Sequence, residues 1–365
     1  MYLYYIVLAL ILLLYLGIYS SNLANKSKRS IYIILSFSLL ILISSIRANT
    51  IGGDLSHYIP NYTVLGKQNW EELLLNRSKY GYMYGILCKI AYAINTNEQS
   101  FLFFTSLFNL LPIAYFIKKH SPRPWLSIYI YITMAFYTNT FNSVRSSMAL
   151  ALGVFMIHYI LERKFWKFLI YYLIALEIHQ TFFPFILLYP LCTKKLSLSY
   201  IIGSISLCVF LAQLALRSNI FTLMALFYDA GAYGKTAINE TYEGAGYSLL
   251  ILLTAMTITF YQINKNKITI EIQLYLHSMT ISCCIQAFAI CSGVLTRISM
   301  FFYIVIIILF PITLLNIKDF KLRRWGYTIT LILFFAYFKM FVMTIDPITK
   351  TNSQATIPYK TFWEK

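Results

Sequence analysis

The stretch YLYYIVLALILLLYLGIY, residues 2–19, carries no charged side chain and is long enough to cross a membrane as a helix. No basic residue precedes it and no small-residue cleavage site follows it, so we expect a retained helix and not a signal peptide. Similar apolar stretches recur along the 365-residue chain, which is 59% hydrophobic and only 12% charged. Because only helices satisfy their own backbone polar groups in lipid, the sequence predicts an all-α polytopic integral membrane protein.

Six short basic segments separate the apolar stretches and set the expected topology. They are KSKR (26–29), KKHSPRP (118–124), ERKFWK (162–167), TKK (193–195), NKNK (264–267) and KDFKLRR (318–324). Lys and Arg concentrate in cytoplasmic loops, so placing all six there puts both termini outside and requires about twelve crossings. The formal charge of +17 is then a consequence of topology, and no nucleic-acid partner is expected. The expected spans lie near 2–19, 31–46, 101–117, 125–141, 143–161, 198–216, 247–263, 271–291, 295–316 and 326–345, with two more from 165–192.

The region 165–192 is predicted to be a broken helix pair. Its sequence FWKFLIYYLIALEIHQTFFPFILLYPL has basic residues at both ends but is too short for two full crossings. The expected apex is Glu177, His179 and Gln180, with Pro184 just beyond. Breaks of this kind occur where the backbone lines a cavity and not lipid, so a cavity is expected here.

One transmembrane domain covering residues 1–365 is expected, because no linker, repeat or low-complexity tract marks a second one. Its outer loops are expected at about 47–79 and about 217–246. Residues 80–95 are expected to form a re-entrant or interfacial helix, since a full span there would move the basic segment at 118–124 to the outer face.

No metal or cofactor is expected. The six cysteines all lie inside or at the ends of apolar segments, without a CxxC pair or a Cys/His cluster, and are predicted to be packing residues. A DxD-like acidic pair that could hold a divalent ion is also missing from the sequence.

In this predicted topology, several unusual charged or titratable residues lie at the same depth, near the outer face of the membrane. They are Arg47, Asp54 and His57 in the first outer loop, Arg145 and Arg297 one turn inside apolar helices, His179 at the break, and Arg217 at the outer end of a span. A lone charge inside an apolar span costs about 3 kcal/mol, so Arg145 and Arg297 are predicted to be functional. The other charges also have structural interpretations: a snorkelling cation, an ion pair between Arg47 and Asp54, a turn aspartate or a buried histidine. Arginines arrayed around a cavity suit a diphosphate or a carboxylate.

Several short motifs occur in a characteristic order. They are R-x4-G-x-D-x3-Y (Arg47, Gly52, Asp54, Tyr58), N-x2-R-x3-A (Asn142, Arg145, Ala149), ERK with a downstream His179, R-x5-Y before a proline (Arg297, Tyr303, Pro311), and IPYK near the end. Together, over about 45–360, they resemble the EpsG family of Wzy-type polysaccharide polymerases. Ser146 and Lys79 depart from that pattern, which often has Gln and an acidic residue at these positions.

The resemblance implies a GT-C-like glycosyltransferase that polymerises undecaprenyl-diphosphate-linked repeat units at the outer face of the bacterial inner membrane, for O-antigen, capsule or exopolysaccharide. The implied donor and acceptor are lipid-linked glycans, and a chain-length regulator and a flippase are implied as further partners. Arg145 and Arg297, with Arg47 and Arg217, would neutralise the diphosphate, and Tyr58 and Tyr303 would help to bind the substrate. We expect His179 to be the base for the acceptor hydroxyl, with Asp54 as the alternative base or as the residue that orients Arg47.

Two other functions use similar residues. An O-antigen ligase has the same donor and similar chemistry but usually a larger outer loop. A flippase or other transporter would also use membrane arginines, but it should show internal symmetry between its halves, and the sequence shows none.

Overall fold

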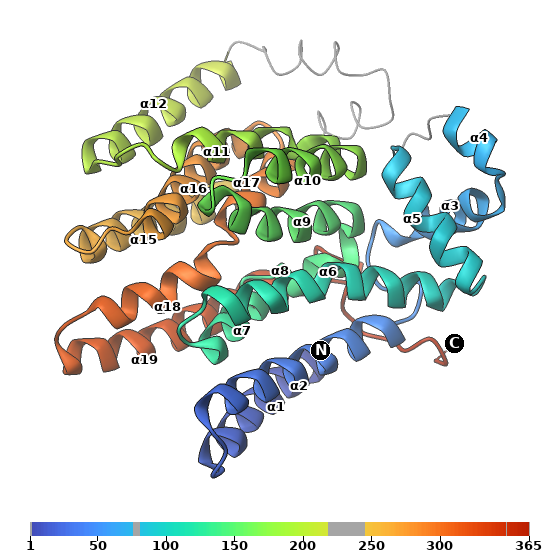
Figure 1. The fold of residues 1–365 in the computed structure, drawn as a ribbon, viewed down its shortest axis with the longest axis horizontal. Coiled ribbons are helices and arrows are strands. Elements are labelled where there is room, and N and C mark those ends of the chain that lie inside the picture. The colour runs from blue at the N-terminus through green and yellow to red at the C-terminus, as the bar shows by residue number, and fades with distance from the viewer. Residues whose placement is uncertain (1, 76–80, 218–244, 348, 365) are drawn as a thin grey trace. The chain divides into compact units, whose positions relative to one another are not determined.

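The computed structural model describes residues 2–75, 81–217, 245–347 and 349–364, and the regular elements in these ranges are all helices (Figure 1). The chain divides into two compact units. Unit 1 comprises Met1–His158, Trp166–Phe182 and Lys318–Lys365, and unit 2 comprises Tyr159–Phe165 and Phe183–Ile317. The expectation of one domain over the whole chain stays a prediction.

Unit 1 is built from the N-terminal helices together with the last long helix of the chain. Its elements are α1 (Tyr2–Ser20), α2 (Asn25–Ile46), α3 (Leu55–Lys67), α4 (Trp70–Leu75), α5 (Tyr82–Ile94), α6 (Glu98–His120), α7 (Pro124–Thr133), α8 (Phe136–Asn142), most of α9 (Val144–Leu161) and α10 (Phe165–Ile178), α19 (Phe320–Tyr337) and the π-helical turn η3 (Phe338–Val342). Helix α2 packs along α6, and α3 packs against α5. The segment expected as an outer loop at about 47–79 therefore contains two helices, α3 and α4.

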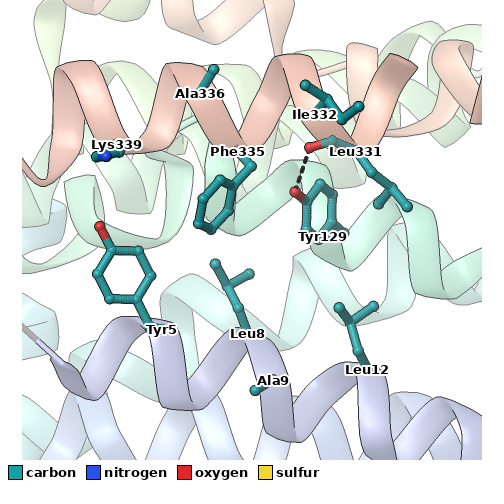
Figure 2. Close-up of a pocket in the computed structure, with 10 residues that line it drawn as sticks. All are labelled: Tyr5, Leu8, Ala9, Leu12, Tyr129, Leu331, Ile332, Phe335, Ala336 and Lys339. Carbon is teal, nitrogen blue, oxygen red and sulfur yellow. Dashed lines mark hydrogen bonds between the residues drawn. The ribbon is translucent and has the colours of Figure 1, made fainter. Parts of the chain in front are cut away.

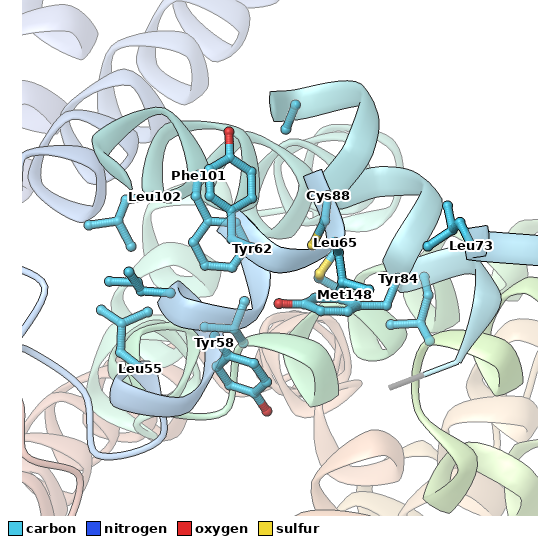
Figure 3. Packing of buried hydrophobic residues seen from close by; sticks show 14 residues of the cluster. Leu55, Tyr58, Tyr62, Leu65, Leu73, Tyr84, Cys88, Phe101, Leu102 and Met148 are labelled. Carbon is cyan, nitrogen blue, oxygen red and sulfur yellow. The ribbon is translucent and has the colours of Figure 1, made fainter. Parts of the chain in front are cut away.

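An apolar cluster fixes α3 and α5 to the longer helices α6 and α9 (Figure 3). The ring of Tyr62 on α3 lies 5.0 Å from that of Phe101 on α6 and 5.5 Å from that of Tyr92 on α5. Its hydroxyl donates a 2.7 Å hydrogen bond to the carbonyl of Asn95, which directly follows α5. Since burying one large apolar side chain contributes about 2 kcal/mol, this cluster holds the short helices in place.

Unit 2 is centred on α16, which packs against α12, α15 and α17. Its elements are η1 (Gln180–Leu187, which begins in unit 1), α11 (Leu188–Leu191), α12 (Leu198–Arg217), α15 (Ala245–Asn264), α16 (Ile270–Ala287), η2 (Phe288–Ile290), α17 (Gly293–Tyr303) and α18 (Ile306–Asn316). Serines join α16 to α17: the hydroxyls of Ser282 and Ser299 lie 2.8 Å apart, a type of contact common between membrane helices. The loop expected at about 217–246 lies almost wholly outside the described residues.

The described residues contain seven helices long and apolar enough to cross a membrane, or eight if the bent pair α17–α18 counts as one span. The all-α membrane fold is thus confirmed, whereas the expected number of about twelve crossings stays a prediction. Expected spans are interrupted in several places. The span near 125–141 breaks at Ala135 (φ 66), and that near 295–316 bends by 49° between α17 and α18. In the 165–192 region α10 ends at Ile178, and the following η1 contains Pro184, which cannot donate a backbone hydrogen bond.

Candidate active site

Arg47 closes the C-terminal end of α2. The last four carbonyls of a helix have no partner within it. Here each accepts a hydrogen bond from another segment: Ile43 from the Tyr359 hydroxyl (2.6 Å), Ser44 from Nη1 of Arg47, Ser45 from the Gln99 amide, and Ile46 from the backbone N–H of Phe362 (3.0 Å). A cation at this end also complements the helix dipole. Arg47 therefore has a structural role as a helix cap.

The guanidinium of Arg47 is buried, with 1% of the residue exposed, in an aromatic environment. It lies 4.7 Å from the ring centroid of Phe141 on α8, a cation–π distance. Burial lowers the pKa of Arg47 to about 10, so the group is still a cation at neutral pH. The possible ion pair between Arg47 and Asp54 is absent from the described residues, where the Arg47 guanidinium donates to the carbonyl and the hydroxyl of Ser44.

The segment after Arg47 lies directly on the end of α8. Gly52 has φ +111, and a Cβ at this position would lie 2.7 Å from the carbonyl carbon of Phe141 and closer still to its oxygen. Its N–H donates to the carbonyl of Ala355 (2.8 Å), and the N–H of Asp54 donates to Oδ1 of Asn142 (3.1 Å). Only glycine fits here, because the backbone is in a left-handed conformation and the neighbouring main chain leaves no space. The motifs at 47–58 and 142–149 thus form one packed unit.

Aromatic contacts lead from α3, the helix that follows Asp54, to Arg145. Asp54 directly precedes α3, and Tyr58 follows it by one turn. The buried ring of Tyr58 lies 6.0 Å from that of Tyr84 on α5, and the guanidinium of Arg145 lies 5.5 Å from the Tyr84 ring centroid. Arg145, in the first turn of α9, donates from Nε and Nη2 to the carbonyl of Ile178 at 3.0 and 2.8 Å. Its guanidinium plane is therefore fixed at the end of α10.

His179 occupies the break directly after that carbonyl and is half-buried. Its N–H makes the last bond of α10, to the carbonyl of Ala175 (2.8 Å), and its own carbonyl accepts from Phe182 (3.0 Å). At Glu177, in the last turn of α10, Gly81 (φ +85) lies against the backbone carbonyl, and the N–H of Tyr82 donates to the carboxylate (3.4 Å). The break thus meets the N-terminal ends of both α5 and α9.

Glu177 belongs to this region and was not among the predicted site residues. It supplies a carboxylate within two residues of His179. The available signal was its position as the one acidic residue in an apolar stretch, at the predicted apex.

The structure brings together five of the predicted site residues within unit 1: Arg47, Asp54, Tyr58, Arg145 and His179. Two others lie in unit 2 on α17, where Arg297 is exposed and Tyr303 is buried. Arg217 is the last residue of α12, and its side chain lies outside the part of the chain that the structure describes.

Comparison with known proteins gives a family but no individual relative. No curated protein and no solved structure gives a significant match. The EpsG family model matches residues 30–361. This range includes Arg47, Asp54 and Arg145 as well as the C-terminal segment that covers Arg47. The chain therefore belongs to the EpsG family, a group of membrane proteins that are similar to Wzy-type polysaccharide polymerases.

Proposed function

We propose that this protein is a glycosyltransferase that polymerises undecaprenyl-diphosphate-linked repeat units at the outer face of the bacterial inner membrane. Family membership supports the class of reaction. The observation that carries the proposal is the meeting of the 47–58, 142–149 and 177–179 segments in unit 1, with Arg145 held through two hydrogen bonds beside His179. The product would be the glycan of an O-antigen, a capsule or an exopolysaccharide.

The main requirement of the reaction is neutralisation of the negative charge that develops on the diphosphate leaving group; a covalent enzyme intermediate is not needed. A hydroxyl of the incoming lipid-linked unit attacks the anomeric carbon of the growing glycan, and the bond from that carbon to the diphosphate oxygen breaks. Undecaprenyl diphosphate leaves with the electron pair, and the hydroxyl proton passes to a base. Arginine is suited to the leaving group because its planar fork matches phosphate oxygens, and such preorganised charge lowers the barrier without a metal.

Each residue then has a distinct role. Arg145 is the proposed diphosphate-binding residue, while the expected contribution of Arg297 and Arg217 to charge neutralisation stays a prediction. His179 is the proposed base, with Asp54 as the alternative. Arg47, buried at the end of α2, acts by positioning the Asp54 segment through Phe141 and the main chain around Gly52.

A deletion strain tests the reaction. Cells without the protein should carry acceptors capped by at most one repeat unit, and complementation with the wild-type gene should restore the length ladder on a polysaccharide gel. A normal ladder in the deletion strain would exclude the polymerase. A complete absence of capped acceptors would instead favour a ligase.

Point variants in the same strain test the site. His179→Ala should reduce polymer by about 10²- to 10⁴-fold, the effect expected for loss of a general base, while purified protein still binds the lipid-linked unit. His120→Ala, at the end of α6 in a basic segment, is the matched control and should polymerise normally. If His179→Ala makes full-length polymer, His179 is not the base, and the same assay on Asp54→Asn tests the alternative.

A further inference from the structure

A long apolar groove lies between α1 and α19, with α7 as its floor (Figure 2). Its volume is about 940 Å³, in the size range of ligand pockets. Leu8 and Leu12 line it from α1, Phe335 and Ala336 from α19, and Tyr129 from α7. The Tyr129 hydroxyl donates to the Leu331 carbonyl (2.8 Å), which ties α7 to α19 at one end of the groove. The groove is therefore a defined feature of unit 1.

The opposite end of this groove carries a cation. Lys339 lies in η3, the π-helical turn that continues α19, and its side chain faces the same end as the hydroxyl of Tyr5 (Figure 2). Within the described residues the Lys339 ammonium makes no hydrogen bond or ion pair, while the Lys339 carbonyl accepts from the Thr344 hydroxyl (3.3 Å). A lysine near the end of an apolar span is costly unless it reaches water or an anion, and π-helical turns are frequent at functional sites. The charge pattern suits a ligand with a long apolar chain and an anionic head.

The charged end of the groove adjoins the candidate active site. Tyr4, the residue before Tyr5, points to the other side of α1. Its hydroxyl donates to the carbonyl of Thr356 (3.0 Å), and its ring lies 6.3 Å from that of Tyr359, which closes the end of α2. One turn of α1 thus contributes both to the groove and to the aromatic environment of Arg47.

We infer that this groove binds the polyprenyl chain of the lipid-linked substrate, with a phosphate of its head group at Lys339. The inference rests on the proposed function. The part of α19 and η3 that lines the groove, from Leu331 to Lys339, is about 12 Å long at ~1.5 Å per residue, so it would hold the part of the chain next to the head group. In the apolar window of Tyr2–Ser20 and in that of Phe320–Val342 only 22% of the residues are buried, so both walls of the groove have large exposed faces. A phosphate at Lys339 places the head group beside the segment that carries Tyr4.

Native mass spectrometry of the purified full-length protein tests this assignment, with undecaprenyl phosphate as the probe and phosphatidylglycerol as the competitor. Ala336→Trp fills the groove and should lower retention of the probe at least tenfold. Ile329→Trp, on the same helix but outside the groove and 59% exposed, is the matched control and should bind like the wild type. Lys339→Gln should weaken binding on the order of tenfold, and Lys339→Arg should restore it. Elution as a single species on size-exclusion chromatography establishes that each variant is folded.

Two results would overturn the assignment. One is wild-type retention of the probe by both Ala336→Trp and Lys339→Gln. The other is displacement of the probe by an equal concentration of phosphatidylglycerol, which would make the groove an ordinary phospholipid site. Failure of the proposed function looks different: a deletion strain with a normal length ladder would exclude the polymerase even if Ala336→Trp loses the probe.

Discussion

Gly52→Ala is predicted to separate the first loop from α8. An alanine at φ +111 costs about 1–3 kcal/mol in backbone strain alone. The added Cβ would also lie 2.7 Å from the carbonyl carbon of Phe141, inside any normal contact, and the obstacle is main chain that cannot rotate away. Relief requires a shift of the Gly52 segment, which would lose the hydrogen bond from Asp54 to Asn142, worth about 1 kcal/mol. We therefore expect a loss of about 3 kcal/mol in the free energy of unfolding and a strong loss of polymer.

Two other glycines are controls for this prediction. At Gly53 a Cβ would meet only the side-chain Oδ1 of Asn142, at 3.2 Å, and at Gly17 nothing lies within 4 Å. Thermal unfolding of purified protein in detergent should rank the alanine variants Gly17, Gly53, Gly52, from the most to the least stable. Equal unfolding temperatures for Gly52→Ala and Gly17→Ala would show that the packing of this loop on α8 is wrong.

Three further variants test other contacts of the site. Arg145→Lys keeps the charge but cannot make two parallel hydrogen bonds, so polymer yield should fall at least tenfold at equal protein abundance; normal ladders would show that the fork is unnecessary. Tyr359→Phe leaves the Ile43 carbonyl without its donor, so the free energy of unfolding should fall by about 1–2 kcal/mol in chemical denaturation. An unchanged denaturation midpoint would show that this hydrogen bond does not stabilise the end of α2. Gly81→Ala, at φ +85 against the Glu177 carbonyl, should reduce both unfolding temperature and polymer, and wild-type values of both would contradict that packing.

The sequence predicted the uninterrupted helices well and the interrupted ones poorly. The stretch 2–19 corresponds to α1, and the span near 31–46 lies within α2, which begins earlier, at Asn25, because a helix can continue beyond the apolar layer. The break at Ala135 carries no local signal, since alanine is the best helix former. The helix after the break, α8, packs through Phe141 on Arg47, a contact between residues far apart in the chain that local sequence does not encode.

The candidate site was partly predictable for a similar reason. The cost of a charge inside an apolar span pointed to Arg145 and Arg297, and the predicted break pointed to His179. The structure holds Arg145 at the break, whereas Arg297 is exposed on α17. Their partners were not predictable, because Arg145 bonds a backbone carbonyl, that of Ile178, and any residue could supply one. The rest of the cap on α2 comes from Tyr359 and Phe362, more than 300 positions later in the sequence than Arg47, and no local pattern reveals it.

The cap on α2 has a consequence for biosynthesis. Proteins are made and inserted from the N-terminus, so α1 and α2 enter the bilayer long before Tyr359 and Phe362 leave the ribosome. During that time the Ile43 and Ile46 carbonyls lack the partners they have in the folded protein, and Arg47 lies uncovered. The cap on the end of α2 is thus completed only after Tyr359 and Phe362 have reached it. A chain that stalls before residue 355 would present an open helix end and an exposed arginine to the quality-control proteases of the membrane.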